Sequence, residues 1–240
     1  MKLTSRKPAN ATPKRLDALS KLPLFYNLQG KRAVIAGGTP PAAWKAELLA
    51  ACGANVQIYA TELSEEMSDL LQRDAAAGTM THHPQPWDLK CFDMAAIAIA
   101  DAANDDEAKA FYCAAVAAGV PVNVVDRPDY GQFQFGSIVN RHPALVAIST
   151  DGAAPVLGQA IRRRIETLLP PHLGEWVQLS MTIRERVSKS LSFGMKRRAF
   201  WGGLADLAFQ RPVAGNDKGK LLGWVTLIAE NENTSAGRAT

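Results

Sequence analysis

Two consecutive glycines lie between an apolar segment and a helix-forming segment near the beginning of the chain. Residues 31–38 read KRAVIAGG, and a threonine and two prolines follow before an alanine-rich stretch. A glycine turn between a strand and a helix lets backbone approach a pyrophosphate, whose charge the N–H groups at the helix start attract. The turn is therefore a candidate dinucleotide site, and its residues are Gly37, Gly38, Thr39, Pro40 and Pro41.

This turn departs from the usual dinucleotide fingerprint. Thr39 stands where a third glycine is usual, and Pro40 and Pro41 remove two N–H donors from the segment that would face the phosphates. Pro41 suits the first helical turn, and Thr39 can cap the helix while its hydroxyl stays available to a ligand. The alternative is a structural strand–helix turn that holds no ligand.

A second candidate is Asp126, which comes directly after the apolar segment Val122–Val125. Open parallel sheets bind their ligands at the carboxyl ends of the strands, where this carboxylate would lie. A carboxylate there can exchange a proton with a bound ligand. The alternative is an aspartate that only forms the turn before Arg127 and Pro128.

Thr61 and Glu62 follow another apolar segment, Asn55–Tyr59. An acidic residue at this place can accept a hydrogen bond from a ribose hydroxyl. Since no arginine stands beside this strand end to pair with a 2′-phosphate, the sequence favours NAD over NADP. The alternative is that Thr61 only caps the helix that begins near Ser64.

Short apolar segments alternate with helix-forming segments over the first 135 residues. The expected strands are Ala33–Ala36, Asn55–Tyr59, Met80–His83, Ala95–Ala100 and Val122–Val125. The expected helices between them are Ala42–Ala51, Ser64–Ala75 and Asp105–Ala118. This alternation predicts right-handed βαβ units and hence an α/β, Rossmann-like domain with a parallel sheet.

The pattern changes after Phe135. Two short strands, Ser137–Asn140 and Leu145–Ser149, flank a turn, and Pro155 opens a periodic helix over Val156–Leu169. Three further helices are expected at Leu173–Ser188, Phe193–Phe209 and Lys218–Ile228. The expected organisation is an N-terminal extension (1–21), the Rossmann-like domain (22–135), a small segment (136–168), a helical domain (169–230) and a flexible tail (231–240).

Composition limits the class of protein. With 240 residues, 47% hydrophobic and 21% charged, the chain is typical of a globular protein that has a sizeable core. The three cysteines lack metal-ligand spacing and predict buried thiols in a reducing compartment. The basic N-terminus has no apolar signal-peptide core, and the longest apolar uncharged run, Met94–Ala100, is too short to cross a bilayer. We expect a cytoplasmic protein that does not bind a membrane.

Basic residues outnumber acidic ones between Ile161 and Phe200. Either these are solvated helix faces or they meet an anionic partner. A small polyanion suits them at least as well as nucleic acid, because no reader motif or series of stacking aromatic residues accompanies the charge. We therefore expect no nucleic-acid partner.

Several motifs follow one another along roughly residues 22–201. They are Leu22–Phe25, Val34–Gly38, Lys45, Asn123–Asp126, Ser137-Ile138, Arg141, Pro143, Pro155–Leu157, Leu169–Gly174 and Arg197–Trp201. In this order they resemble the N-terminal module of the siroheme synthase family, which combines precorrin-2 dehydrogenase and sirohydrochlorin ferrochelatase activities.

The resemblance implies a specific chemistry. Such proteins oxidise precorrin-2 to sirohydrochlorin with NAD, and many then insert ferrous iron as a second substrate. It implies that Asp126 is the catalytic carboxylate and that Thr150, Gly152 and His172 contribute to binding the tetrapyrrole. It also implies a homodimer, formed through a dimerisation segment over residues 136–168. No dedicated metal site is expected.

The loop at 149–155 departs from the family pattern, as the glycine turn does. Asp151, Ala153 and Ala154 replace residues that are usually serine, threonine or glycine, which should weaken the binding of a polycarboxylate. Alternatively, Asp151 caps the following helix. Two other hypotheses thus stand beside the dehydrogenase: a catalytically weakened homologue that binds a tetrapyrrole, and an unrelated nucleotide-sensing regulator.

Overall fold

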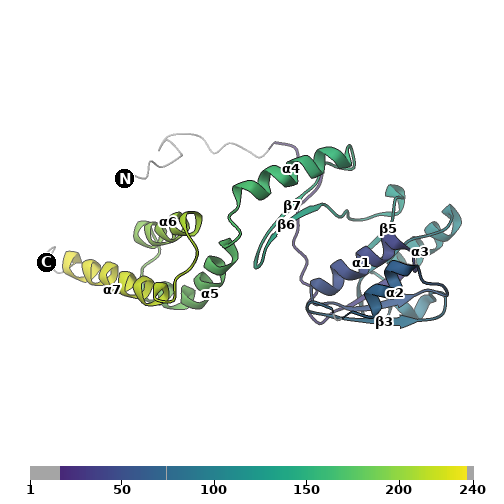
Figure 1. The fold of residues 1–240 in the computed structure, drawn as a ribbon, viewed down its shortest axis with the longest axis horizontal. Coiled ribbons are helices and arrows are strands. Elements are labelled where there is room, and N and C mark those ends of the chain that lie inside the picture. The colour runs from purple at the N-terminus through teal and green to yellow at the C-terminus, as the bar shows by residue number, and fades with distance from the viewer. Residues whose placement is uncertain (1–16, 74, 237–240) are drawn as a thin grey trace. The chain divides into compact units, whose positions relative to one another are not determined.

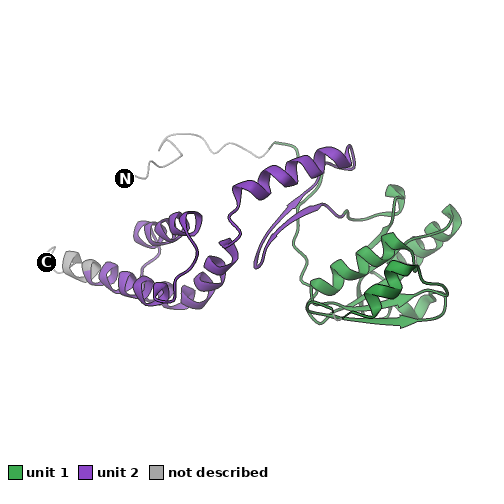
Figure 2. Cartoon of the chain, in the orientation of Figure 1, with its two compact units in different colours: residues 1–134 green, residues 135–240 purple. Residues whose placement is uncertain are grey.

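The computed structural model describes residues 17–73 and 75–236, and the side chains of residues 231–236 are left out of the description. Most of the expected N-terminal extension and the end of the expected tail therefore lie outside the described residues. The chain divides into two compact units, Met1–Gln134 and Phe135–Thr240 (Figure 2). Each unit is described by itself.

Unit 1 is built on a five-stranded parallel sheet, which confirms the expected α/β fold class (Figure 1). The strand order is β3-β2-β1-β4-β5. From β1 the chain adds β2 and β3 on one side, and it then returns to add β4 and β5 on the other side of β1. The strands are β1 (Arg32–Ala36), β2 (Asn55–Tyr59), β3 (Thr79–His83), β4 (Ala95–Ala100) and β5 (Val122–Val124). Such a reversal of strand order is where open α/β sheets form a crevice for a ligand.

Three helices connect these strands, and side-chain caps determine where they begin. The helices are α1 (Pro40–Ala51), α2 (Glu65–Leu71) and α3 (Asp105–Ala117), with short 3-10 segments at η1 (Leu89–Phe92) and η2 (Pro128–Tyr130). The side chains of Thr39, Ser64 and Asn104 accept hydrogen bonds from backbone N–H groups in the first turns of α1, α2 and α3. The expectation that Thr61 caps the second helix is wrong, because Ser64 does so.

The core of unit 1 follows from the apolar strands. Val34 and Ile35 are adjacent in β1 and both fully buried, which is the pattern of a strand covered on both faces. On one face, the ring of Phe111 in α3 packs against Trp87 and Phe92, with ring centroids 5.1 and 5.2 Å away. Phe111 belongs to the same buried cluster as Val34, Ala98 and Val122, so α3 packs against the sheet.

Unit 2 begins with an antiparallel hairpin of β6 (Ser137–Arg141) and β7 (Ala144–Ile148). Four helices follow, drawn from green to yellow in Figure 1: α4 (Pro155–Leu168), α5 (Leu173–Ser190), α6 (Met195–Gln210) and α7 (Asp217–Ala236). Trp176, Ile183 and Phe200 are the largest fully buried side chains of the core shared by α5, α6 and α7. Helix α7 continues to Ala236, beyond Ile228, where the sequence predicts its end.

An ion pair with a buried carboxylate closes the loop between α6 and α7. Asp217 is 2% exposed, and both of its carboxylate oxygens accept hydrogen bonds of 2.7 Å from the Arg211 guanidinium. The Ala214 N–H donates to the same carboxylate at 2.7 Å. These donors hold the pKa of Asp217 at about 2, so the pair is ionised at neutral pH.

The cysteines differ from expectation. Cys91 is buried, but Cys52 and Cys113 are exposed, because each lies on the outer side of a helix end or helix face instead of in the core. All three are free thiols. Among the described residues, no helix is long and apolar enough to span a bilayer.

Candidate dinucleotide site and active site

The loops that follow the parallel strands of unit 1 bring three groups of candidate residues to one edge of the sheet. Parallel strands all present their carboxyl ends on the same side. The loop after β1 holds Gly37–Thr39, the loop after β2 holds Thr61 and Glu62, and Asp126 follows β5. The residues expected to bind a dinucleotide therefore share an edge with the expected catalytic carboxylate.

Both glycines of the turn are required by close backbone contacts. A Cβ on Gly38 would lie 2.1 Å from the carbonyl oxygen of Glu62, and the Gly38 oxygen accepts a hydrogen bond of 2.8 Å from the Ser64 N–H. Gly37 has φ of +118° and donates its N–H to the Tyr59 oxygen at 2.9 Å. The turns after β1 and β2 are thus packed together, leaving no room for a side chain on Gly38.

The beginning of helix α1 has fewer free donors than a typical pyrophosphate site. Pro40 and Pro41 have no N–H group. The Ala42 N–H donates to Thr39 Oγ1 at 3.4 Å, and the Ala43 N–H donates to the Thr39 oxygen at 2.9 Å. The expected capping role of Thr39 is confirmed. Its hydroxyl, however, is not left for a ligand, because it donates to the carboxylate of Asp101.

Asp101 is a residue of this edge that the sequence analysis did not identify. It directly follows β4, the neighbour of β1 at the reversal of strand order, and it is half-buried. Its N–H donates to the Ala36 oxygen at 2.9 Å, so its backbone is fixed to the end of β1. An aspartate directly after the apolar run of β4 was a signal that could have found it.

Asp126 lies at the tip of a tight turn. It is exposed, with φ of +55°, a left-handed conformation that aspartate and asparagine tolerate better than most residues. Backbone hydrogen bonds of both neighbours hold the turn. The Val125 N–H donates to the Ala100 carbonyl oxygen at 2.8 Å, and the Arg127 N–H donates to the Val124 carbonyl oxygen at 3.2 Å. The turn-forming role and the catalytic role are therefore compatible for this residue.

An ion pair and a tyrosine connect the turn to the beginning of α3. Arg127 lies 3.2 Å from Asp105, and the Tyr130 hydroxyl donates to the other carboxylate oxygen of Asp105 at 2.7 Å. That hydrogen bond is the main cause that raises the pKa of Tyr130. These contacts join Arg127 and Tyr130, which follow Asp126 in the chain, to the first residue of α3.

Lys45 in α1 is the cation electrostatically coupled to Asp126. Burial lowers the pKa of Lys45 to about 8, and the negative charge of Asp126 acts in the opposite direction. Its ammonium nitrogen lies 4.2 Å from the centroid of the Trp44 ring. A lysine near its titration point beside a carboxylate is typical of a site that handles protons.

The residues of this edge fit a dinucleotide, although incompletely. The exposed Glu62 carboxylate suits the adenosine ribose, while the close contact at Gly38 is with the Glu62 backbone and packs the two turns together. For the pyrophosphate, the backbone of the Gly37–Thr39 turn and the dipole of α1 remain. The prolines and the Thr39–Asp101 hydrogen bond reduce the donors available there.

The expected tetrapyrrole-binding residues lie in unit 2. Thr150 packs against the first turns of α4, with its Cγ2 and Oγ1 3.8 Å from a Cβ built on Gly158. Gly152 has φ of +78° in the same loop, and His172 immediately precedes α5. In the described part of the chain, His172 Nε2 is buried with no hydrogen-bond partner.

The expectation that Asp151 caps the following helix is wrong. Helix α4 begins after Ala154, whose side chain makes no cap. Asp151 instead adopts φ of +55°, and its N–H donates to Ser149 Oγ at 3.1 Å. Asp151 thus lies three residues before Ala154, the residue at the N-cap position of α4.

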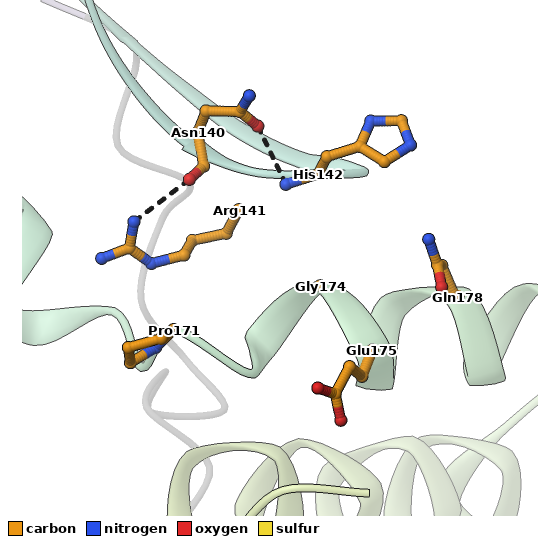
Figure 3. A pocket seen from close by; sticks show the side chains of 7 residues that line it. All are labelled: Asn140, Arg141, His142, Pro171, Gly174, Glu175 and Gln178. Carbon is orange, nitrogen blue, oxygen red and sulfur yellow. Dashed lines mark hydrogen bonds between the residues drawn. The ribbon is translucent and has the colours of Figure 1, made fainter.

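Unit 2 also contains a cavity of about 320 Å³ between the hairpin and α5, drawn in Figure 3. Its lining residues are Asn140, Arg141, His142, Pro171, Gly174, Glu175 and Gln178. The Arg141 guanidinium is already used, since it donates to the carbonyl oxygens of Leu169, Glu166 and Asn140 at 3.1 Å. Arg141 thus joins the hairpin to the end of α4. No cluster of three or more potential metal ligands occurs within residues 17–73 and 75–236.

Comparisons with known proteins identify the family to which this chain is similar. The "Putative NAD(P)-binding" family model matches residues 24–137, and the "Sirohaem biosynthesis protein central" model matches residues 146–168. The chain is 34% identical to a siroheme synthase of Hahella chejuensis over 201 residues, covering 81% of this chain and 42% of the relative. It is 39% identical to a siroheme synthase of Tolumonas auensis over 181 residues, covering 75% and 37%. The chain spans about two fifths of the length of these relatives.

A solved structure has the same fold. The structure of SirC, precorrin-2 dehydrogenase, aligns with a TM-score of 0.60 at 15% identity, covering 86% of this chain and 99% of that one. The sheet and its glycine turn define an α/β protein with a nicotinamide-dinucleotide-binding domain. The chain belongs to the family of siroheme synthase N-terminal modules.

Proposed function

We propose that this chain oxidises precorrin-2 to sirohydrochlorin with NAD. The observation that carries the proposal is the position of Asp126, on the same edge of the sheet as the glycine turn and Glu62. The curated siroheme synthases that the chain resembles support the choice of substrate.

The reaction removes one hydride and one proton from the macrocycle. A bound nicotinamide would supply the hydride acceptor. The exposed carboxylate of Asp126 accepts the proton, and the turn fixed by the Arg127–Asp105 pair keeps this carboxylate in place. Lys45, whose pKa burial lowers to about 8, interacts electrostatically with Asp126 and so places a cation near the reacting carboxylate.

NAD is preferred to NADP in this proposal because of Glu62. The exposed carboxylate at the end of β2 accepts a hydrogen bond from a ribose hydroxyl and repels a 2′-phosphate. Titration of the protein with NAD and with NADP tests the preference. Tighter binding of NADP would contradict it.

The chain acts as a homodimer in this proposal, and α4 supplies the supporting observation. Of its 14 residues only Gly158 is buried, while Val156, Leu157 and Leu168 are 78%, 52% and 73% exposed. A helix with this much exposed apolar surface is typical of one that packs against a partner. Light scattering of the purified chain measures the stoichiometry.

Free thiols suit the reducing cytoplasm, which we propose as the location.

The tetrapyrrole-binding role of Thr150, Gly152 and His172 is also part of the proposal. The buried, unpartnered Nε2 of His172 supports it, because an orphaned polar atom is costly unless a ligand satisfies it. Exposed as it is, Asp126 is also available to accept pyrrole protons when ferrous iron, the second substrate, is inserted.

One assay tests the main proposal. Purified protein is mixed under anaerobic conditions with precorrin-2 and NAD, and the absorption spectrum of sirohydrochlorin is followed. Its appearance only in the presence of both protein and NAD is expected. If the protein binds the macrocycle without turnover, the weakened homologue is the better description, for which the scarcity of free donors at Thr39–Ala43 is the favouring observation.

A further inference from the structure

The contact between Thr39 and Asp101 places a carboxylate at the beginning of helix α1. The two residues are 62 positions apart in sequence, and their side chains meet because β1 and β4 are neighbours in the sheet. The Thr39 hydroxyl donates to Asp101 Oδ2, while Thr39 Oγ1 accepts the Ala42 N–H. One hydroxyl therefore joins the first turn of the helix to a negatively charged group.

This arrangement engages three of the donors that could bind a phosphate oxygen at the beginning of α1. In the first turn of α1, two residues have no N–H, and the N–H groups of Ala42 and Ala43 both donate to Thr39. The Thr39 hydroxyl, a further donor at this helix start, donates to the carboxylate oxygen of Asp101. An anionic oxygen of the protein thus takes a hydrogen bond that a pyrophosphate oxygen would take in a dinucleotide complex.

We infer that Asp101 limits the affinity of this chain for dinucleotides, because its carboxylate competes with the pyrophosphate for the Thr39 hydroxyl and repels it. The inference rests on the proposed dinucleotide-binding function and adds a residue that sets its strength. A bound pyrophosphate must either displace the carboxylate from Thr39 or lie beside it, and both cost affinity.

The side chain of Asp101 can be replaced without disturbing the backbone contacts of this residue. Its N–H donates to the Ala36 carbonyl oxygen, and its own carbonyl oxygen lies 3.0 Å from a Cβ placed on Gly37, so main-chain atoms make these contacts. In Asp101→Asn the amide oxygen still accepts from Thr39, while the charge is lost. Asp101→Ser is a second neutral variant, in case the amide disturbs the turn.

Isothermal titration with NAD and with ADP-ribose tests the inference on the full chain, after thermal unfolding has verified that each variant is folded. Removal of one unit charge near a pyrophosphate should tighten binding by about tenfold. The gain should become smaller as salt is added, because salt screens repulsion between charges. Asp69→Asn, which removes an exposed charge from α2, is the control and should leave the affinity unchanged.

The outcomes separate this inference from the proposed function. Equal or weaker binding by both folded neutral variants overturns the role of Asp101, while binding by the wild-type chain leaves the proposed function intact. A gain that does not change with salt also overturns it, since a structural effect would behave in that way. If neither the wild type nor any variant binds a dinucleotide, both the inference and the proposed function fail.

Discussion

Replacement of Asp126 by asparagine is the most informative single change in the active site. The backbone at this position has φ of +55°, and asparagine is among the few residues that adopt it readily. The side chain is exposed, so no buried contact is lost. The substitution therefore removes the proton-accepting carboxylate and leaves the shape of the turn unchanged.

The expected magnitudes follow from these facts. Loss of a positioned general base lowers turnover by about 10²- to 10⁴-fold. The free energy of unfolding should change by less than about 0.5 kcal/mol, as for other exposed substitutions. Asp126→Ala should lose activity to the same extent, and it should also destabilise the protein by about 1 kcal/mol because alanine is strained at this φ.

The assay compares single-turnover oxidation of precorrin-2 by the wild type, Asp126→Asn and Asp129→Asn. Asp129 is an exposed aspartate in η2 and controls for the loss of one charge close to the site. Thermal unfolding of the same samples gives the stability. Wild-type turnover in Asp126→Asn, or equal loss in the Asp129 control, would refute the assignment of Asp126 as the base.

Three further predictions concern other parts of the chain. Gly38→Ala should lower the free energy of unfolding by about 2 kcal/mol or more and weaken NAD binding, because its Cβ would meet the Glu62 carbonyl oxygen at 2.1 Å. Gly215→Ala is the control, since a Cβ there meets open space, and it should change neither thermal unfolding nor NAD titration. The pKa of Asp217 is about 2 against an ordinary 3.8, so its contribution to stability is complete above pH 3.8 and is lost as the pH falls towards 2. In Asp217→Asn the unfolding midpoint should therefore depend less on pH over this range, and identical acid profiles for variant and wild type would count against the prediction. Burial raises the pKa of the Cys91 thiol to about 11, so iodoacetamide should alkylate exposed Cys113 in the folded protein and Cys91 only after unfolding, as peptide mass spectrometry can determine.

The fold of this chain was largely predictable because local patterns determine it. Each of the five parallel strands begins and ends within about one residue of its expected bounds, and Pro155 correctly marked the beginning of α4. The second helix ends at Leu71, earlier than expected at Ala75. Helix ends are less predictable, since fraying and loop geometry decide them.

The candidate site was predictable only in part. The glycine turn, Glu62 and Asp126 were found because they follow apolar strands directly. Helix N-caps were harder to predict than strand ends. Thr61 and Asp151 are suitable residue types, yet the N-cap positions are held by Ser64 and Ala154. The residue at the cap is decided by where the chain enters the helix, which residue type alone does not determine. The contact between Thr39 and Asp101 could not be read from local sequence, since it depends on the order of strands in the sheet.

The most direct test of the central claim is the coupling between the two products of the reaction. Purified protein is given precorrin-2 and NAD without oxygen, and the fluorescence of NADH is recorded together with the absorption of sirohydrochlorin. The account predicts that the two rise together in equal amounts and that both disappear in Asp126→Asn. Sirohydrochlorin formed without NADH, or formed equally well by the variant, would contradict it.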